Sequence, residues 1–299
     1  MDLGNLLHSI FNFENYGELL VLVQNSIWAG AVLGLLGGLM GTFVMKRDLA
    51  FAVHGISELS FAGAAFALLI GADIILGSLA GSVLAAVVLG LMGVRARDKN
   101  SIIGVIMPFG LGLGILFLSL YEGRAANKFG LLTGQIVSVG TVQLQVLAAA
   151  AVVVMLALVA IWRPLTFASV DPDVATARGV PVRALSLAFM VLLGISVALS
   201  IQIVGALLVL ALLITPAAAA MRVTSSPRLV VTLSIVFAMT ATVGGILLAL
   251  GGRLPISPYV TTLSFLIYVT CRVIGGARAK RGLNGRVVRT PTPTSTPVA

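Results

Sequence analysis

Charged residues are scarce in this chain of 299 residues, of which only 10% are Asp, Glu, Lys or Arg. A soluble protein carries about 25% charged residues. Hydrophobic residues make up 59% of the chain, and its mean hydropathy is +1.12. There is too little polar surface to coat a globule in water, which excludes an ordinary soluble enzyme and a disordered chain. The composition indicates a polytopic membrane protein.

Two further absences narrow the possible functions. The single cysteine, Cys271, cannot form a disulfide within the chain, so a disulfide-stabilised scaffold is excluded. The sequence contains no G-x-x-x-x-G-K-[ST] phosphate-binding loop, so we expect no ATP to be bound by that route. The energy for any transport across the membrane would therefore come from an ion gradient or from a separate ATPase subunit.

Long uncharged stretches divide the chain into segments that can cross a bilayer, for which a helix needs about 20 apolar residues. The sequence predicts helical spans at 21–45, 50–70, 74–93, 102–120, 142–162, 184–201, 203–221, 229–250 and 257–275. The pair between 184 and 221 is almost continuous, broken only by Ser200 and Gln202, so it could instead be one span and a re-entrant segment. We therefore expect an all-α transmembrane helical bundle of eight or nine spans.

The basic residues predict the orientation, because Lys and Arg concentrate in cytoplasmic loops. With nine spans and the N-terminus outside, only three of the 19 Lys and Arg residues fall on the outer side, namely Arg124, Lys128 and Arg253. This bias favours nine spans over eight, since removing one span would place the basic C-terminal tail outside. We therefore interpret the net charge of +9 as a signal of the chain's orientation in the membrane, with anionic lipid as the counter-charge, rather than as a sign of nucleic acid binding.

This layout predicts three regions. Residues 1–20 lack the basic start of a signal peptide, and we expect them to form an interfacial segment on the extracytoplasmic side. Residues 21–275 form the transmembrane domain. Residues 276–299 form a cytoplasmic tail that is first basic and then rich in Pro and Thr. We expect a multi-pass protein of the plasma membrane with its C-terminus in the cytoplasm.

Two ionisable residues, His54 and Glu58, lie inside the second predicted span, whereas the other apolar segments hold almost none. Their spacing of four residues places both side chains on one face of a helix, about one turn apart. Glu58 lies roughly 13 Å into the span, where a carboxylate costs on the order of 2.5–3.5 kcal/mol. We therefore expect its side chain to face a cavity, a partner or an ion.

Three interpretations of this pair are open. The two groups could satisfy each other as a buried pair, although apolar residues would fill the space at lower cost. An imidazole nitrogen and a carboxylate oxygen also suit a divalent ion such as Zn, Mn or Fe, with Ser57 and Ser60, water or a second copy of the chain completing the ligand set. Alternatively, Glu58 could titrate during the cycle of a gradient-driven secondary cation transporter.

The loop between the fifth and sixth predicted spans contains a short helix with clear start and stop signals. Asp171 suits the N-cap, Pro172 suits the first helical position, and Asp173 suits the positive end of the helix dipole. Gly179 ahead of Pro181 ends the helix. By the charge count this helix lies on the cytoplasmic side, where it is either an ordinary surface helix or a coupling helix that docks on an ATPase.

Three stretches of the sequence resemble the membrane subunit of metal-ion ABC transporters, the ABC-3 family of zinc and manganese permeases. The second predicted span is similar to the family's D-x-x-x-H pair, with the order reversed as His54 then Glu58. Residues 171–181, DPDVATARGVP, are similar to its acidic start, central Ala and closing Gly-[IV]-Pro. Residues 202–217 are similar to the most recognisable run of the family, and the likeness covers roughly residues 20–275.

The resemblance implies an ABC importer permease, with a second permease copy in a homodimer, cytoplasmic ATP-binding subunits, an extracytoplasmic metal-binding protein and no nucleic acid as its partners. The transported ion would be Mn, Zn or Fe, held in transit by His54 and Glu58, with no permanently bound cofactor. ATP hydrolysis would occur in the partner chain, and this chain would not be an enzyme. The resemblance implies ATPase coupling through Asp171, Asp173, Ala175, Arg178 and Gly179. The reversed pair leaves the metal open, and a metal chelate is a further candidate cargo.

Overall fold

The computed structural model describes residues 16–92, 99–123, 131, 139–205, 208–250 and 256–280. Within these residues the regular secondary structure is helical, with no strand. Eight helices are long and apolar enough to cross a membrane: α3 (Gln24–Lys46), α4 (Ala50–Leu69), α5 (Ile74–Met92), α6 (Lys99–Leu120), α8 (Thr141–Val170), α10 (Val182–Val204), α13 (Pro227–Ala249) and α14 (Ile256–Lys280). The shorter helices are α2 (Tyr16–Leu22), α9 (Pro172–Ala177), α11 (Val209–Leu213) and α12 (Thr215–Val223). The predicted all-α bundle is confirmed.

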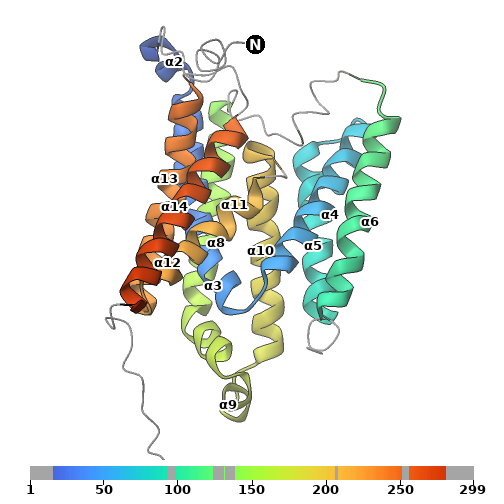
Figure 1. Ribbon diagram of the computed structural model, residues 1–299. Coiled ribbons are helices and arrows are strands. Elements are labelled where there is room, and N and C mark those ends of the chain that lie inside the picture. The colour runs from blue at the N-terminus through green and yellow to red at the C-terminus, as the bar shows by residue number, and fades with distance from the viewer. Residues whose placement is uncertain are drawn as a thin grey trace, which may run out of the picture.

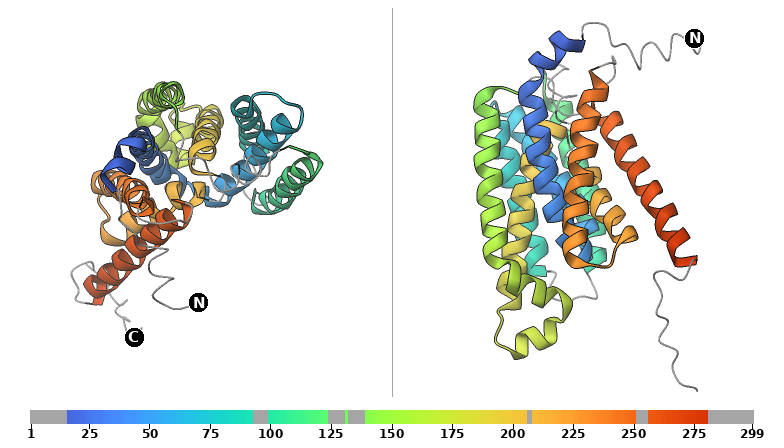
Figure 2. Two further views of the ribbon diagram at one scale, coloured as in Figure 1. Left: turned by 90° about the horizontal axis from the view of Figure 1, so that it is seen from above. Right: turned by 90° about the vertical axis from the view of Figure 1, so that its left-hand side faces the viewer.

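The long helices run side by side, with α2 at one end of the bundle and the last turns of α14 at the other (Figure 1). Seen along the bundle, α4, α5 and α6 form one group, and the remaining long helices form another (Figure 2, left). Helix α10 joins the two groups, because it packs against α5 and α4 on one side and against α8 on the other.

The prediction of a continuous helix over 203–221 is wrong. Helix α10 ends at Val204, and Gly205 follows with a φ of +84°, a conformation that glycine adopts without a steric penalty. The next helices, α11 and α12, have only five and nine residues. Together they connect the end of α10 to the start of α13 at the opposite end of the bundle (Figure 1). The segment is not among the eight described helices long enough to cross a membrane, so the choice between a ninth span and a re-entrant segment stays a prediction.

The end of the fifth span differs from the sequence prediction, and two predicted regions lie mostly outside the described residues. The fifth span was expected to end at 162, but α8 continues to Val170 through an internal proline, Pro164. The predicted N-terminal segment and cytoplasmic tail fall mostly on residues 1–15 and 281–299, which lie outside the described residues. Their assignment to the two sides of a membrane stays a prediction.

Glycines bring α4 and α5 into close contact. A Cβ atom at Gly63 would collide with the carbonyl oxygen of Gly77, and one at Gly81 would collide with the carbonyl oxygen of Leu59. Small residues of this kind let the backbones of membrane helices approach each other closely. The packing fixes the position of α4, the helix that carries both predicted metal ligands.

Candidate functional site

His54 and Glu58 lie on the same face of α4, as their spacing predicted. The Nε2 atom of His54 is 3.6 Å from the Oε1 atom of Glu58, and the two side chains are 33% and 13% exposed. A distance of 3.6 Å is too long for a hydrogen bond. A tetrahedral ion about 2 Å from each ligand atom separates two ligand atoms by roughly 3.3 Å. The observed separation is thus slightly longer than the ligand spacing around a tetrahedral ion and lies within the range of a direct ion pair.

The second ring nitrogen of His54 lies away from solvent. The Nδ1 atom is buried and has no hydrogen-bond partner in the part of the chain that the structure describes. A buried polar atom without a partner costs about 1–3 kcal/mol. No hydrogen bond from the described part of the chain offsets this cost, and the nitrogen that faces Glu58 is the other one, Nε2.

The two serines proposed as supporting ligands are occupied in helix packing. The hydroxyl of Ser60 lies 2.9 Å from the carbonyl oxygen of Ser78 on α5 and donates to it, and it lies 2.8 Å from the Ser78 hydroxyl. Ser57 is only 1% exposed. The structure adds no support for Ser57 or Ser60 as metal ligands, so their ligand role stays a prediction from the sequence. It does place His54 and Glu58 next to each other.

The described residues contain no cluster of three or more His, Cys, Asp or Glu side chains that could hold a metal ion. His54 and Glu58 thus offer two protein ligands and leave the other coordination positions of an ion open. Structural zinc sites are closed by four protein ligands. A site that passes an ion onward needs binding weak enough to release it. Two ligands in the first half of α4 do not close a metal site by themselves.

The short helix predicted in the loop is present as α9, with the expected caps. The Asp171 carboxylate accepts a hydrogen bond of 3.0 Å from the backbone N–H of Val174, and Pro172 occupies the first turn. At the other end, Gly179 has a φ of +79°. The backbone N–H groups of Gly179 and Val180 donate to the carbonyls of Thr176 and Ala175. This is the Schellman pattern of helix termination.

Helix α9 projects from one end of the bundle (Figure 1). Ala175 is fully buried and anchors the helix on its inner side. Among the other predicted coupling residues, Asp173, Arg178 and Gly179 are exposed, and Asp171 is half-buried. The outer surface of the helix is mixed, with the charged Asp173 beside the exposed apolar side chain of Val174, while Ala175 holds the helix against the bundle.

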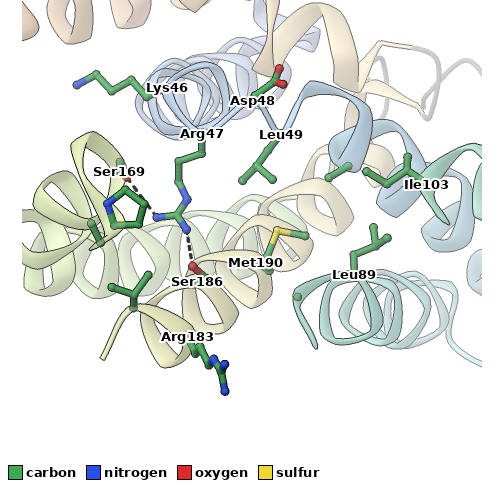
Figure 3. Close-up of a pocket in the computed structure, with 15 residues that line it drawn as sticks. Lys46, Arg47, Asp48, Leu49, Leu89, Ile103, Ser169, Arg183, Ser186 and Met190 are labelled. Carbon is green, nitrogen blue, oxygen red and sulfur yellow. Dashed lines mark hydrogen bonds between the residues drawn. The ribbon is translucent and has the colours of Figure 1, made fainter. Parts of the chain in front are cut away.

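An open cavity of about 470 Å³ lies beside α9, and neither His54 nor Glu58 lines it. It is lined by the turn between α3 and α4, by the first turn of α4 and by the neighbouring ends of α5, α6, α8, α9 and α10. The Arg47 side chain extends across this region toward Ser169 and Ser186 (Figure 3). The sequence placed Arg47 only among the basic loop residues. Its location directly before α4 was the one signal that could have singled it out.

Comparison with known proteins decides the family. The model of the family described as "ABC 3 transport family" matches residues 20–274. The chain belongs to the ABC 3 transport family. The resemblance inferred from the second span, the loop helix and residues 202–217 is thereby confirmed, over nearly the same range.

Named members of the ABC 3 transport family align along most of their length. The manganese transport system membrane protein MntC of Halalkalibacterium halodurans is 29% identical, over 75% of this chain and 77% of that protein. The high-affinity zinc uptake system membrane protein ZnuB of Haemophilus influenzae is 24% identical, over 82% of this chain and 94% of that protein. The solved structure of PsaBC from Streptococcus pneumoniae in complex with Fab has a TM-score of 0.78 at 23% identity, over 89% of this chain and 98% of that one. This chain therefore has the same fold.

Proposed function

We propose that this chain is the membrane-spanning permease subunit of an ATP-driven ABC importer for a divalent metal ion, Mn, Zn or Fe. The observation that carries the proposal is the His54–Glu58 pair on one face of α4, in a chain of the ABC 3 transport family. The names of the manganese and zinc relatives support the choice of a metal ion over a larger metal chelate.

The pair would act as a transit site for the ion. The imidazole Nε2 and the carboxylate oxygen would each replace one water molecule of a hydrated cation as it enters the bundle. Remaining water, or groups from a second permease copy in a homodimer, would fill the other positions. Because both ligands that the described part of this chain supplies lie on α4, a modest movement of α4 would be enough to release the ion.

The driving energy would come from cytoplasmic ATP-binding subunits, since the sequence lacks a phosphate-binding loop of the Walker type. Helix α9, with its exposed Asp173 and Arg178, would be their docking element. An extracytoplasmic metal-binding protein would deliver the ion at the opposite face. This requires a plasma-membrane protein with its N-terminus outside and its C-terminus in the cytoplasm, as the distribution of Lys and Arg predicts.

Reconstitution separates this function from a gradient-driven transporter in which Glu58 titrates. The family match is to an ABC transport family and gives the gradient-driven alternative no support. The test is uptake of Mn or Zn into liposomes that contain this chain, its ATP-binding subunit and its metal-binding protein. We expect uptake that requires ATP and persists when the proton gradient is dissipated. Uptake without ATP that collapses with the gradient would refute the importer proposal.

A further inference from the structure

Arg47 lies where the metal-ligand helix begins. It follows the last residue of α3, and its backbone N–H donates to the carbonyl of Phe43. Asp48 comes next with a φ of +53°, the left-handed region that Asp tolerates better than most residues. Leu49, which is buried, is the N-cap of α4. A displacement of Arg47 therefore reaches the start of α4 through only two residues.

The Arg47 side chain binds both sides of the segment that carries α9. One guanidinium nitrogen donates to the hydroxyl of Ser169 at 3.2 Å, and the other donates to the hydroxyl of Ser186. Ser169 is the penultimate residue of α8, and Ser186 lies in the second turn of α10. Figure 3 shows the side chain reaching both hydroxyls. The guanidinium also lies 5.7 Å from the ring centre of Phe189, within range of a cation–π contact.

The hydrogen bonds from Arg47 to Ser169 and Ser186 lie beside the cavity near α9. Leu49 and Ala52, at the start of α4, line the cavity, and Met190 on α10 faces it from another side. An unfilled space provides no van der Waals contact to transmit a displacement. Although α10 packs against α4 elsewhere, the cavity leaves the packing incomplete between the first turn of α4 and the α8–α9–α10 segment, and Arg47 spans this region with two directional bonds.

Ser169 and Ser186, the two residues that accept hydrogen bonds from Arg47, are neutral. Neutral acceptors suit a contact that breaks and forms again in each transport cycle. Among the described residues the structure records no carboxylate within ion-pair distance of Arg47, and the ion pair that it does record is His54–Glu58. Bonds between a guanidinium and a hydroxyl are weaker than bidentate bonds to a carboxylate. Two serine acceptors can thus hold the turn in place and still release it when α8 and α10 move.

We propose that Arg47 is a positioning residue that transmits movement of α9 to α4 through its bonds to Ser169 and Ser186. The inference rests on the proposed function. In that function, docking and ATP-driven closure of the partner would move α9 together with the adjoining ends of α8 and α10. Arg47 would draw the α3–α4 turn with them and displace His54 and Glu58, so that the bound ion is released.

The test measures coupling rather than activity alone. The complex of this chain with its ATP-binding subunit and metal-binding protein is reconstituted in liposomes, with Mn or Zn as the probe. Metal uptake and ATP hydrolysis are measured in the same sample for wild type, Arg47→Met and the double variant Ser169→Ala/Ser186→Ala. Arg228→Met is the matched control, because Arg228 is an exposed arginine on α13, outside the segment that Arg47 contacts.

We expect both test variants to bind the ATP-binding subunit and to hydrolyse ATP, while the metal moved per ATP falls roughly fivefold or more. Arg47→Lys, which keeps one charged donor, should restore part of the coupling. The double variant keeps Arg47 and removes only two hydroxyls, so it tests the bonds even if Arg47→Met folds poorly. The control should couple like wild type.

Two results would overturn the inference. An unchanged ratio of metal to ATP in the double variant would show that the bonds transmit nothing. A parallel loss of ATP hydrolysis and uptake in the double variant, with the ratio unchanged, would assign Arg47 a purely structural role. Neither result touches the proposed function, which fails only if the wild-type complex does not move metal with ATP.

Discussion

The His54 Nε2 and Glu58 Oε1 atoms face each other at 3.6 Å on one side of α4. This separation is longer than a hydrogen bond and slightly longer than the ligand spacing around a tetrahedral ion. The two groups lie within ion-pair distance of each other and close to the spacing of two ligands that share a cation. The predictions for the proposed transport site start from this relationship.

Exchanging the two ligands tests whether their order matters. In the double variant His54→Glu/Glu58→His, the imidazole and the carboxylate still lie one turn apart on the same face. We expect metal uptake to persist, with a changed preference between Mn and Zn, because the ligand types are kept and their depths are exchanged. Competition of the two ions in the uptake assay measures the preference. If the exchange abolishes uptake of both ions while His54→Ala leaves it intact, the pair is not the site.

The hydroxyl of Ser60 is expected to serve packing and not the ion. Ser60→Ala removes its bond to the carbonyl of Ser78 and should lower the stability of the purified chain by about 0.5–1.5 kcal/mol. Metal affinity and uptake per folded molecule should stay unchanged. Thermal unfolding and the uptake assay measure the two effects separately. Loss of uptake at unchanged stability would instead make Ser60 a ligand.

Asp171→Ala removes the N-cap of α9. We expect this change to destabilise the helix by about 0.5–2 kcal/mol and to weaken association with the ATP-binding subunit, measured by copurification. Asp73→Ala is the matched control, because Asp73 caps α5 through the backbone N–H groups of Ile75 and Leu76, in a different loop. The control should lose a cap and keep the ATP-binding subunit. Equal copurification of both variants and wild type would reject α9 as the docking element.

The contact between α4 and α5 should not tolerate a methyl group. Gly63→Ala would force a side chain against the carbonyl of Gly77, so we expect a clear fall in the melting temperature and in metal uptake. Gly104→Ala on α6 is the control, since a Cβ there would meet nothing within 4 Å. It should be neutral or stabilising, because glycine inside a helix costs roughly 0.5–1 kcal/mol relative to alanine. Similar melting temperatures for the two variants would contradict the packing described for α4.

Features that depend on neighbouring residues could be predicted from the sequence. The start and end of α9 follow from Asp171 and Gly179, because helix caps are local interactions between side chain and backbone. His54 and Glu58 were evident because ionisable groups are rare in apolar spans and their spacing fixes their common face.

Features that depend on contacts between distant segments could not be predicted in the same way. Hydropathy placed the interruption at Ser200 and Gln202, whereas α10 ends at Val204, before Gly205. The second break, at Ile214 between α11 and α12, was missed. Arg47 looked like one loop residue among many, because its acceptors Ser169 and Ser186 lie 122 and 139 positions away. The engagement of Ser60 with Ser78 is likewise a contact between two helices.

The most direct measurement is ATP-driven uptake of Mn or Zn by the reconstituted complex carrying Glu58→Gln. The control is Glu122→Gln, an exposed glutamate between α6 and α8. We expect Glu58→Gln to lose nearly all uptake while it still assembles with its ATP-binding subunit, because the amide keeps the shape and removes the charge that attracts the cation. The control should transport like wild type. Uptake at the wild-type rate in Glu58→Gln would contradict a transport path through His54 and Glu58.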